Sequence, residues 1–276
     1  MRNFIEEQQL HSETLGFDLS KIEQGTDQWH RSKAGVVSAS NAYILLMKGS
    51  VAPFPKDIEI ISGDKRGVNS VSFEGEVFTG TKQACTDFVR NRLPIIPSAT
   101  RQTYMSQLVA SVATGLLPDE IKARPLQWGK DHEQEANDAY SAATFETIDS
   151  IAFIYQDKTM RAGCSPDGLI SGEEKGLELK CPWSSAVWVD FAHNGYIKPE
   201  EIIQCQFSMM ITDFKEWGFA KFDPRNVNCK KLHHVIIERD EKVIAEQREG
   251  LASFIKDMDI MLDNLGMSFG MQWNDN

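Results

Sequence analysis

Three side chains between residues 164 and 183 are of the types that bind a cation and act on a phosphate. Asp167 follows a proline, and Glu178 and Lys180 stand two residues apart in the short stretch KGLELKCP. Residues two apart in an extended strand share a face, so the Glu178 carboxylate and the Lys180 ammonium should point the same way while Leu179 packs into the interior. Burying two charges without a task is costly, which favours a functional site over a solvated ion pair.

The Gly-rich turn after Asp167 has about the length that joins adjacent antiparallel strands, so it can bring this carboxylate beside Glu178. Two carboxylates held together repel, and a hard divalent cation such as Mg²⁺ relieves the repulsion. The backbone carbonyl of Leu179 can add a neutral ligand. Lys180 can then orient and help deprotonate an attacking water, or stabilise charge on a phosphate in the transition state.

The elements that must hold these residues are predicted from the periodicity of apolar residues. Ser38 or Ser40 can cap a helix that begins at Asn41. We expect a mainly helical segment at 21–47, helices at 101–117, 126–145, 184–194, 199–212 and 240–265, three short strands within 151–182, and strands at 216–222 and 232–239. This order predicts an α/β fold with a central mixed sheet flanked by helices.

Residues 51–97 have a different texture, with Gly, Ser, Val and Pro between alternating apolar residues. We interpret them as strands or an irregular insertion at the periphery of a single domain that spans 1–276. Basic residues on such a loop can grip backbone phosphates, although a solvated surface loop is an equally good interpretation. They are Lys56, Lys65, Arg66, Lys82, Arg90 and Arg92.

The composition limits the classes of partner. The 276 residues carry a formal net charge of −11, so binding to nucleic acid would need a local basic groove or a bridging metal. No run is long and apolar enough to cross a bilayer, and the first residues do not resemble a signal peptide. The five cysteines are odd in number and lack CxxC spacing, which indicates reduced thiols in the cytoplasm.

Several motifs together resemble one family. SPDG followed by LELKCP is similar to the PD-(D/E)xK nuclease motif, and the surrounding sequence resembles the bacteriophage lambda exonuclease family, a group of phage-type alkaline exonucleases. The likeness recurs in EQGTDQWH, LQWGKDHE, MRAGCSPDGL, DPR, HHVIIERDEK and FGMQW. It covers nearly the whole chain except the first residues and about 51–97.

The resemblance implies a restriction-endonuclease-like PD-(D/E)xK core. It also implies a Mg²⁺-dependent exonuclease that degrades one strand of linear double-stranded DNA from its 5′ end to mononucleotides, in phage-type homologous recombination. Two ions would flank the scissile phosphate, with Mn²⁺ as a substitute for Mg²⁺.

Carried over by position, the resemblance makes Asp167, Glu178, Glu133 and the Leu179 carbonyl the metal ligands, and Lys180 the catalytic lysine. Gln204, in IIQCQFS, matches a glutamine that lines the active site. Gln206 is the less favoured neighbour, and Glu135 is expected to be a surface acid.

The family also holds the 5′-phosphate of its substrate in a small pocket. Ser40 and Ser165 match its serine positions, and Trp29 matches an aromatic residue near the DNA entrance. Lys33 stands where the lambda enzyme has an arginine. A lysine supplies the charge without the two-pronged hydrogen-bonding fork, and Arg31 is a candidate to replace part of it.

The resemblance further implies a homotrimeric ring that threads DNA ends, cooperation with a phage single-strand annealing protein, and a location in the cytoplasm of a bacterial host. Two alternatives remain open. The same core can cut DNA internally as an endonuclease, or the chain can be a DNA-end-binding recombination scaffold without nuclease activity.

Overall fold

The computed structural model describes residues 4–117 and 124–274, which form two compact units. The first unit comprises 1–46 and 103–276, and the second comprises 47–102. The sequence analysis places an insertion at about 51–97, and the second unit begins and ends within a few residues of those limits. The predicted assignment of the whole chain to one domain stays a prediction.

A five-stranded mixed sheet forms the centre of the first unit. Its strand order is β13-β12-β11-β10-β7, with β11 and β12 parallel and every other pair antiparallel. The strands are β7 (Ile148–Asp149), β10 (Gly168–Ile170), β11 (Lys175–Lys180), β12 (Glu216–Phe222) and β13 (Leu232–Glu238). Five of the six residues of β11 are buried, because it is an interior strand with a neighbour on each side.

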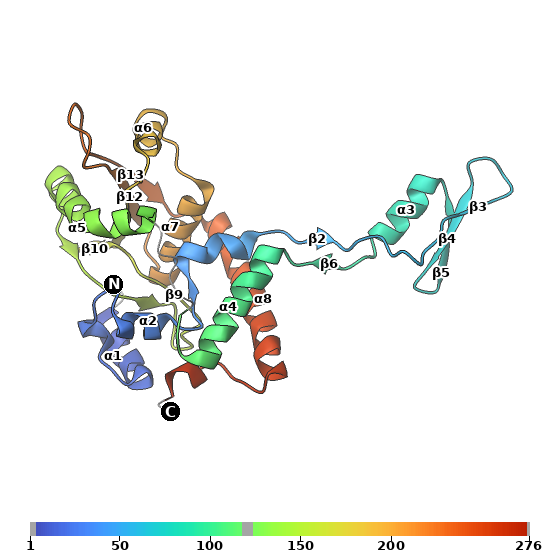
Figure 1. Cartoon of the computed structure of the whole chain (residues 1–276), viewed down its shortest axis with the longest axis horizontal. Helices are drawn as coiled ribbons and strands as arrows, with labels where there is room; N and C mark the ends of the chain where they lie inside the picture. The colour runs from blue at the N-terminus through green and yellow to red at the C-terminus, as the bar shows by residue number, and fades with distance from the viewer. Residues whose placement is uncertain (1–3, 118–123, 275–276) are drawn as a thin grey trace. The chain divides into compact units, whose positions relative to one another are not determined.

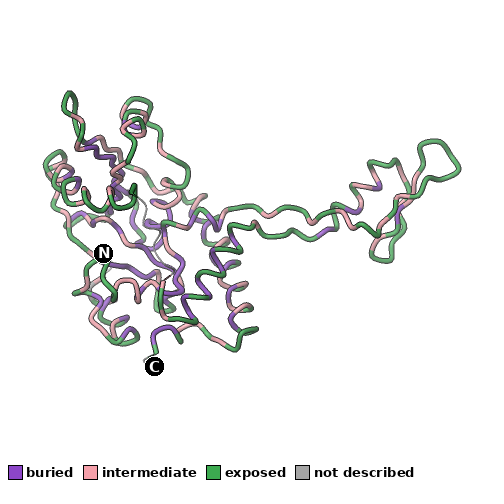
Figure 2. Tube along the Cα trace, viewed as in Figure 1, coloured by how far each residue is buried: buried purple, intermediate pink, exposed green. Residues whose placement is uncertain are grey.

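Helices cover both faces of this sheet (Figure 1). Leu177 and Leu179 of β11 pack with Ala136 and Tyr140 of α5 (Arg124–Thr144). On the other face, the core contains residues of α6 (Ser185–Asn194), α7 (Pro199–Thr212) and β12, namely Phe191, Cys205, Met209, Trp217 and Phe219. Figure 2 shows the buried residues concentrated on the strands and on α7. The alternation of β11 therefore sends odd-numbered side chains toward α5 and even-numbered ones toward α7.

A smaller sheet of order β1-β9-β8 lies in the same unit, with β1 (Val37–Ser38) parallel to β9 (Ala162–Cys164) and β8 (Ile154–Tyr155) antiparallel to it. The remaining elements are mostly helical. They are α1 (Phe4–Leu15), η1 (Leu19–Lys21), α2 (Asp27–Lys33), the 3₁₀ helix η2 (Ala39–Leu46), α4 (Ala99–Thr114), α8 (Glu241–Asn264) and η3 (Met271–Trp273).

The second unit contains a meander and one helix. Its elements are β2 (Ser50–Val51), β3 (Ile61–Ser62), β4 (Asn69–Phe73), β5 (Glu76–Gly80), α3 (Lys82–Arg90) and β6 (Ile95–Ile96). Val71, Cys85 and Val89 form its small core. Arg92, one of the basic residues singled out from the sequence, pairs with Glu76 at 3.1 Å inside this unit.

Segment 21–47 is mainly helical, as predicted, through α2 and η2. A short strand interrupts it, because Val37 and Ser38 pair with β9, and the expected helix from Asn41 is a 3₁₀ helix that begins at Ala39. The strands expected within 51–97 are present, but the prediction missed α3, whose apolar face covers β4. At Val37 and Ser38 tertiary pairing outweighs local propensity. The predicted helix at 199–212 is confirmed as α7, whereas the expected three strands within 151–182 are four.

Candidate functional site

The β10–β11 hairpin positions the first acid of the predicted site. The Asp167 backbone nitrogen donates to Leu177 O at 3.1 Å, and its carboxylate oxygen Oδ2 accepts from the Leu179 nitrogen at 2.5 Å. Gly168 follows because a Cβ there would collide with Ile148 of β7. The expectation that a turn places Asp167 beside Glu178 is confirmed, since the carboxylate is bonded to the residue that follows Glu178.

Glu178, Lys180 and Gln204 form one hydrogen-bonded cluster on the opposite side of β11 from Leu179. Lys180 Nζ donates to Glu178 Oε1 at 2.5 Å, and Gln204 Nε2 donates to the same oxygen at 2.7 Å. Lys180 Nζ also donates to Gln204 Oε1 at 3.4 Å. The shared face that the spacing predicts is therefore confirmed. The Glu178 side chain is only 4% exposed, so its charge depends on these two donors.

Gln206 lies on the same helix as Gln204 but has a structural role. Its Nε2 donates to Glu238 O at 2.7 Å, and its Oε1 accepts from the Asp240 nitrogen at 2.9 Å. Both ends of the amide thus hold the turn between β13 and α8. Of the two glutamines, Gln204 is the one at the cluster.

Glu133 reaches the same region from α5 and acts on the cluster through its charge. Burial raises the pKa of Glu133 above its ordinary value, and the nearby charge of Glu178 raises it further. The pKa of Asp167 is raised well above its usual range, first by burial, then by Glu178, with a smaller contribution from Glu133. Asp167 and Glu133 are therefore easier to protonate than solvated carboxyls, as expected for buried carboxylates beside like charges.

Lys180 offsets part of this negative charge. Burial by itself would lower the pKa of its ammonium, but the charges of Glu178 and Asp167 outweigh burial and raise the pKa above the ordinary lysine value. Lys180 in turn lowers the pKa values of Asp167 and Glu133. Lys180 is thus one positive charge beside the three carboxyl groups of Asp167, Glu178 and Glu133.

The donor set suits a hard divalent cation. All three acids offer oxygen ligands, and Asp167 Oδ1 and Glu178 Oε2 accept no hydrogen bond from the described residues. Within residues 4–117 and 124–274, no three His, Cys, Asp or Glu side chains lie close enough together to hold a metal ion as they stand. The three acids are linked to one another by charge, and binding a cation would need their carboxylates to approach one another.

Two hollows meet at the acids and differ in charge. Asp167 and Glu133 line both. The hollow of about 470 Å³ is lined by Glu23, Asp138 and Glu146 as well, with no Lys or Arg among the described residues around it. The hollow of about 570 Å³, called the lysine-lined hollow below, has Lys180, Lys198 and Lys221 beside one further acid, Glu201. Its lysines offset its acids, so an anionic chain would be repelled less there than in the first hollow.

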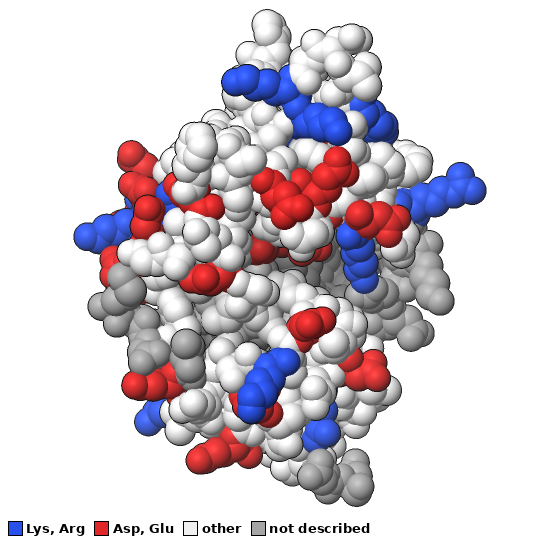
Figure 3. All heavy atoms as spheres, turned by 90° about the vertical axis from the view of Figure 1, so that its left-hand side faces the viewer, with Lys and Arg blue, Asp and Glu red and all other residues white. Residues whose placement is uncertain are grey.

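Figure 3 shows one face of the molecule, the left-hand side of Figure 1, on which acidic side chains border a hollowed band across the middle. A polyanion cannot approach such a face on charge alone, which agrees with the overall charge of −11.

Trp29, Lys33 and Ser165, expected at the DNA end, come together. Trp29 Nε1 donates to Ser165 Oγ at 3.1 Å and to Ala152 O at 3.0 Å. Lys33 Nζ lies 3.7 Å from the centre of the Trp29 ring. Gln24 Nε2 donates to Pro166 O at 2.8 Å, which fixes the turn between Ser165 and Asp167.

Ser40 and Arg31 are placed differently. Ser38 and Gly163 are partners in the parallel β1–β9 pair, so Ser40 and Ser165 both follow the carboxyl ends of adjacent strands. Arg31 Nη2, by contrast, donates to Trp273 O at 3.0 Å near the C-terminal end. Of the predicted phosphate-binding residues, Arg31 is the one directed to another part of the fold.

Sequence analysis missed a buried ion pair behind the cluster. Lys221 Nζ lies 3.0 Å from Glu201 Oε2, its side chain is 0% exposed, and it is the register partner of Lys180 on β12. The signal was present in EWGFAKF, where a lysine interrupts an apolar strand as Glu178 and Lys180 do in β11. Cys181 also lines the lysine-lined hollow; burial, followed by the charges of nearby acids, raises its pKa to about 12, so its thiol stays neutral.

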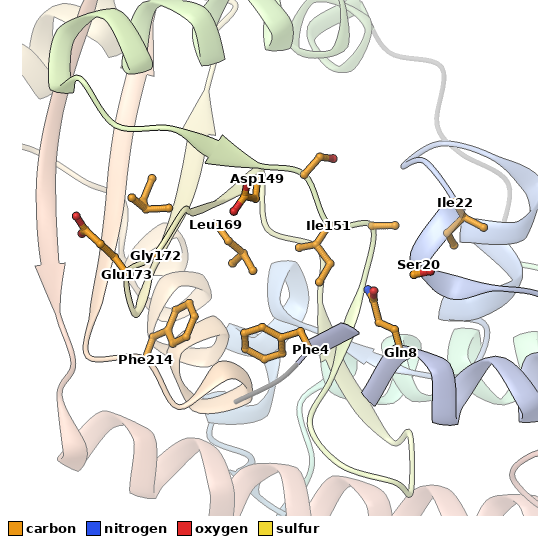
Figure 4. A pocket seen from close by; sticks show the side chains of 13 residues that line it. Phe4, Gln8, Ser20, Ile22, Asp149, Ile151, Leu169, Gly172, Glu173 and Phe214 are labelled. Carbon is orange, nitrogen blue, oxygen red and sulfur yellow. The ribbon is translucent and has the colours of Figure 1, made fainter. Parts of the chain in front are cut away.

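A larger hollow lies elsewhere and holds none of the predicted catalytic side chains. Figure 4 shows this pocket of about 850 Å³ between α1 and the edge of the main sheet, with Phe4, Gln8, Leu169 and Phe214 around it. Its lining is mostly apolar and carries no cluster of charged groups. Size alone therefore does not locate the chemistry here.

Comparison with known proteins gives three kinds of likeness. The model of the YqaJ-like viral recombinase domain matches residues 87–215, a range that contains all five predicted catalytic residues. The chain is 43% identical over 77 residues to the protein ExoD of Escherichia coli (strain K12), which is 28% of this chain and 87% of ExoD.

Among solved structures, the alkaline exonuclease LHK-Exo of Laribacter hongkongensis matches with a TM-score of 0.64 at 22% identity, over 87% of this chain and 96% of that one. Its complex with dAMP matches with a TM-score of 0.65 at 23% identity over the same shares. A phage-related exonuclease of Haemophilus somnus 129PT matches with a TM-score of 0.53 at 12% identity, over 83% of this chain and 96% of that one. The predicted α/β fold with a PD-(D/E)xK core is confirmed by the fold shared with LHK-Exo.

Proposed function

Because the chain belongs to the YqaJ-like viral recombinase family of phage exonucleases, we propose that it degrades one strand of linear double-stranded DNA from the 5′ end and releases mononucleotides. The resemblance inferred from the motifs is thereby confirmed for the family. The observation that carries the proposed reaction is the group of Asp167, Glu178, Lys180 and Gln204, in which Asp167 lines two hollows and Lys180 one of them. The solved complex of LHK-Exo with dAMP, a mononucleotide, supports the proposed product.

Asp167, Glu178 and Glu133, with the Leu179 carbonyl, would hold Mg²⁺, as two ions or with Mn²⁺ in their place. When bound, the metal would supply a Lewis acid and lower the pKa of a bound water, so that a hydroxide is available to form the new P–O bond while the ester P–O bond to the leaving nucleotide breaks. Lys180 brings a positive charge to the lysine-lined hollow, where it can pair with a non-bridging phosphate oxygen. Gln204 keeps Glu178 and Lys180 in their relative positions through its two hydrogen bonds.

The end of the DNA strand would be held by the group that follows β1 and β9. Lys33 supplies the charge for a 5′-phosphate, and Ser165 and Ser40 supply hydroxyl groups at the same edge of the smaller sheet. Trp29 positions Ser165 through its hydrogen bond to the hydroxyl oxygen, and its ring packs against the Lys33 ammonium. Arg31 is bonded to Trp273, so Lys33 is the stronger candidate for the phosphate.

The test uses three substrates: a linear duplex with a 5′-phosphate at one end, the same duplex with a 5′-hydroxyl, and a covalently closed circle. Each is incubated with Mg²⁺ or with chelator, and mononucleotide release is followed over time. We expect digestion of the linear duplexes in Mg²⁺ alone and an intact circle. Asp167→Asn should be inactive, whereas Glu135→Gln, a change at an exposed acid on α5, should be active.

Each alternative has its own outcome. Cutting of the closed circle would establish an endonuclease, and binding of ends without hydrolysis in any metal would establish a scaffold. Activity of Asp167→Asn equal to that of the wild type would refute the proposed site.

The assembly is a separate part of the proposal. A homotrimeric ring around the DNA would have a solution mass about three times the 31.1 kDa of the chain, and a strictly monomeric, processive enzyme would refute the ring. A phage single-strand annealing protein is the proposed partner, and the bacterial cytoplasm is the proposed location. All five cysteines are free thiols, which agrees with a reducing compartment. No helix of the described residues is long and apolar enough to cross a membrane.

A further inference from the structure

An exposed tryptophan stands at the end of the catalytic strand. Trp183 is three residues beyond Lys180, lines the same hollow of about 570 Å³, and is 49% exposed. Three residues span at most about 10 Å, so the indole is within the reach of one or two nucleotides from a phosphate held at Lys180. An indole left half in water beside a charged cluster has apolar surface that a ligand in the hollow can cover.

The turn that carries Trp183 is held rigidly by one arginine. Arg225 Nη1 donates to Trp183 O at 2.9 Å, and Nη2 donates to Pro182 O at 3.0 Å. The Asp223 carboxylate holds Arg225 in a fork, with Nε to Oδ1 at 2.7 Å and Nη2 to Oδ2 at 2.9 Å. The DPR segment at 223–225 therefore fixes the backbone of the turn at two consecutive carbonyls.

Trp128 supports the indole from α5. The two rings are nearly perpendicular, at 87° with centroids 5.7 Å apart. Trp128 is itself packed against His132, at 4.1 Å between ring centres, and against the Arg225 guanidinium at 4.5 Å. Among the described residues, no second ring and no cation lies on Trp183. It thus presents a preformed and uncovered aromatic surface, which loses little conformational entropy when a ligand binds.

We propose that Trp183 is a stacking platform for a nucleobase of the DNA strand that is being cut. Each nucleotide carries a phosphate and a planar base. One nucleotide can therefore place its phosphate at the lysines of the hollow and its base on the Trp183 ring. Stacking does not discriminate among bases, as a nuclease that digests successive nucleotides requires. This inference rests on the proposed function, because it names the part of the substrate that the same site binds.

The test measures DNA affinity in the non-cleaving Asp167→Asn background, so that it does not depend on turnover. Trp183→Ala and Trp183→Phe are compared with Phe145→Ala, a control at an aromatic residue that is 94% exposed and lines none of the described hollows. The probes are a linear duplex with normal bases and a series in which the first, second or third nucleotide from the 5′ end lacks its base.

On the normal duplex, Trp183→Ala should bind about 5- to 150-fold more weakly, while Trp183→Phe and Phe145→Ala should stay within about threefold of the parent. At one of the three positions, removal of the base should weaken binding by the parent as much as Trp183→Ala does on the normal duplex. The same abasic duplex should cause no further loss of affinity in Trp183→Ala. The affinity of the parent, in which Trp183 is intact, for the abasic duplexes tests the proposal even if a Trp183 variant misfolds.

Three results would overturn the stacking platform. They are an affinity of Trp183→Ala within twofold of the parent, equal losses on normal and abasic duplexes, or no dependence of the parent on any abasic position. Failure of the proposed function would give a different result. If the protein binds DNA ends without cutting them, its DNA affinity would still depend on Trp183 and on the presence of the base.

Discussion

The Asp167 carboxylate is fastened to the strand that carries the other two members of the motif, through a hydrogen bond of 2.5 Å from the Leu179 nitrogen to its Oδ2. Leu179 lies between Glu178 and Lys180. The register of the β10–β11 hairpin therefore also determines where the Asp167 carboxylate lies relative to these two side chains. The second oxygen, Oδ1, accepts no hydrogen bond from the described residues. One oxygen positions the side chain and the other is left for chemistry.

The two acids of α5 provide a matched pair of substitutions. Glu133 lines both hollows and repels Asp167 and Glu178, whereas Glu135 is exposed and pairs with Lys231 at 3.5 Å. We expect Glu133→Gln to lower nucleotide release by at least about 100-fold, because it removes a charge from the proposed metal ligands, and Glu135→Gln to keep most of the activity. Initial rates on a linear duplex at several Mg²⁺ concentrations check this. Equal rates for the two variants would remove Glu133 from the site.

The two glutamines of α7 should separate activity from stability. Gln204→Ala removes the contacts to Glu178 and Lys180, so we expect kcat to fall by about 10-fold or more with little change in thermal stability. Gln206→Ala leaves the Asp240 nitrogen and the Glu238 carbonyl without their partner, and should lower the free energy of unfolding by about 1–3 kcal/mol. Kinetics below the melting range and denaturant titration measure the two effects. The reverse pattern would contradict the assignment of Gln204.

The buried pair of Lys221 and Glu201 should be costly to break from one side. Lys221→Met leaves the mostly buried Glu201 carboxylate with the Lys198 nitrogen as its donor and no counter-charge, so we expect the free energy of unfolding to fall by about 3–5 kcal/mol. Adding Glu201→Leu should restore much of this loss, because the apolar pair needs no desolvation of charge. Lys231→Met, at an exposed ion pair, should cost less than about 1 kcal/mol. Denaturant unfolding of the single and double variants gives the coupling, and additive losses would argue against a paired role.

His234 should make the fold less stable at mildly acidic pH. It packs on Tyr140, with ring centres 5.5 Å apart, and its pKa is lowered from 6.5, first by burial and then by the charge of His233. The charges of Lys175 and Lys230 also lower the pKa, and that of Glu146 raises it. Because the folded pKa lies below the unfolded value, the unfolded chain binds more protons between the two values, and stability falls as the pH drops through 6.5.

Between pH 7.5 and 5.5 the free energy of unfolding of His234→Gln should therefore rise relative to that of the wild type. The raised pKa values of Asp167 and Glu133 act in the opposite direction in both proteins, so the comparison between the two isolates the effect of His234. Denaturant titrations at several pH values measure both slopes. Identical slopes would mean that His234 has the same pKa in the folded and unfolded chain.

The sequence alone determined the parts of the site that lie close together along the chain. Asp167, Glu178 and Lys180 belong to one hairpin, where the alternation of a strand and the length of a turn dictate which side chains meet. The same local logic predicted α7 from its apolar spacing. It failed at Val37 and Ser38, because pairing with β9, more than 120 positions later in the chain, decides that segment.

Only the tertiary structure decided which distant residues complete the site. Gln204 and Glu133 came from a resemblance and not from spacing, since each reaches β11 from a helix on a different face of the sheet. Nothing local distinguishes Gln204 from Gln206, or shows that Arg225 holds the carbonyl of Trp183. These contacts depend on how helices pack on the sheet, and packing is set by the whole core and not by the residues on either side.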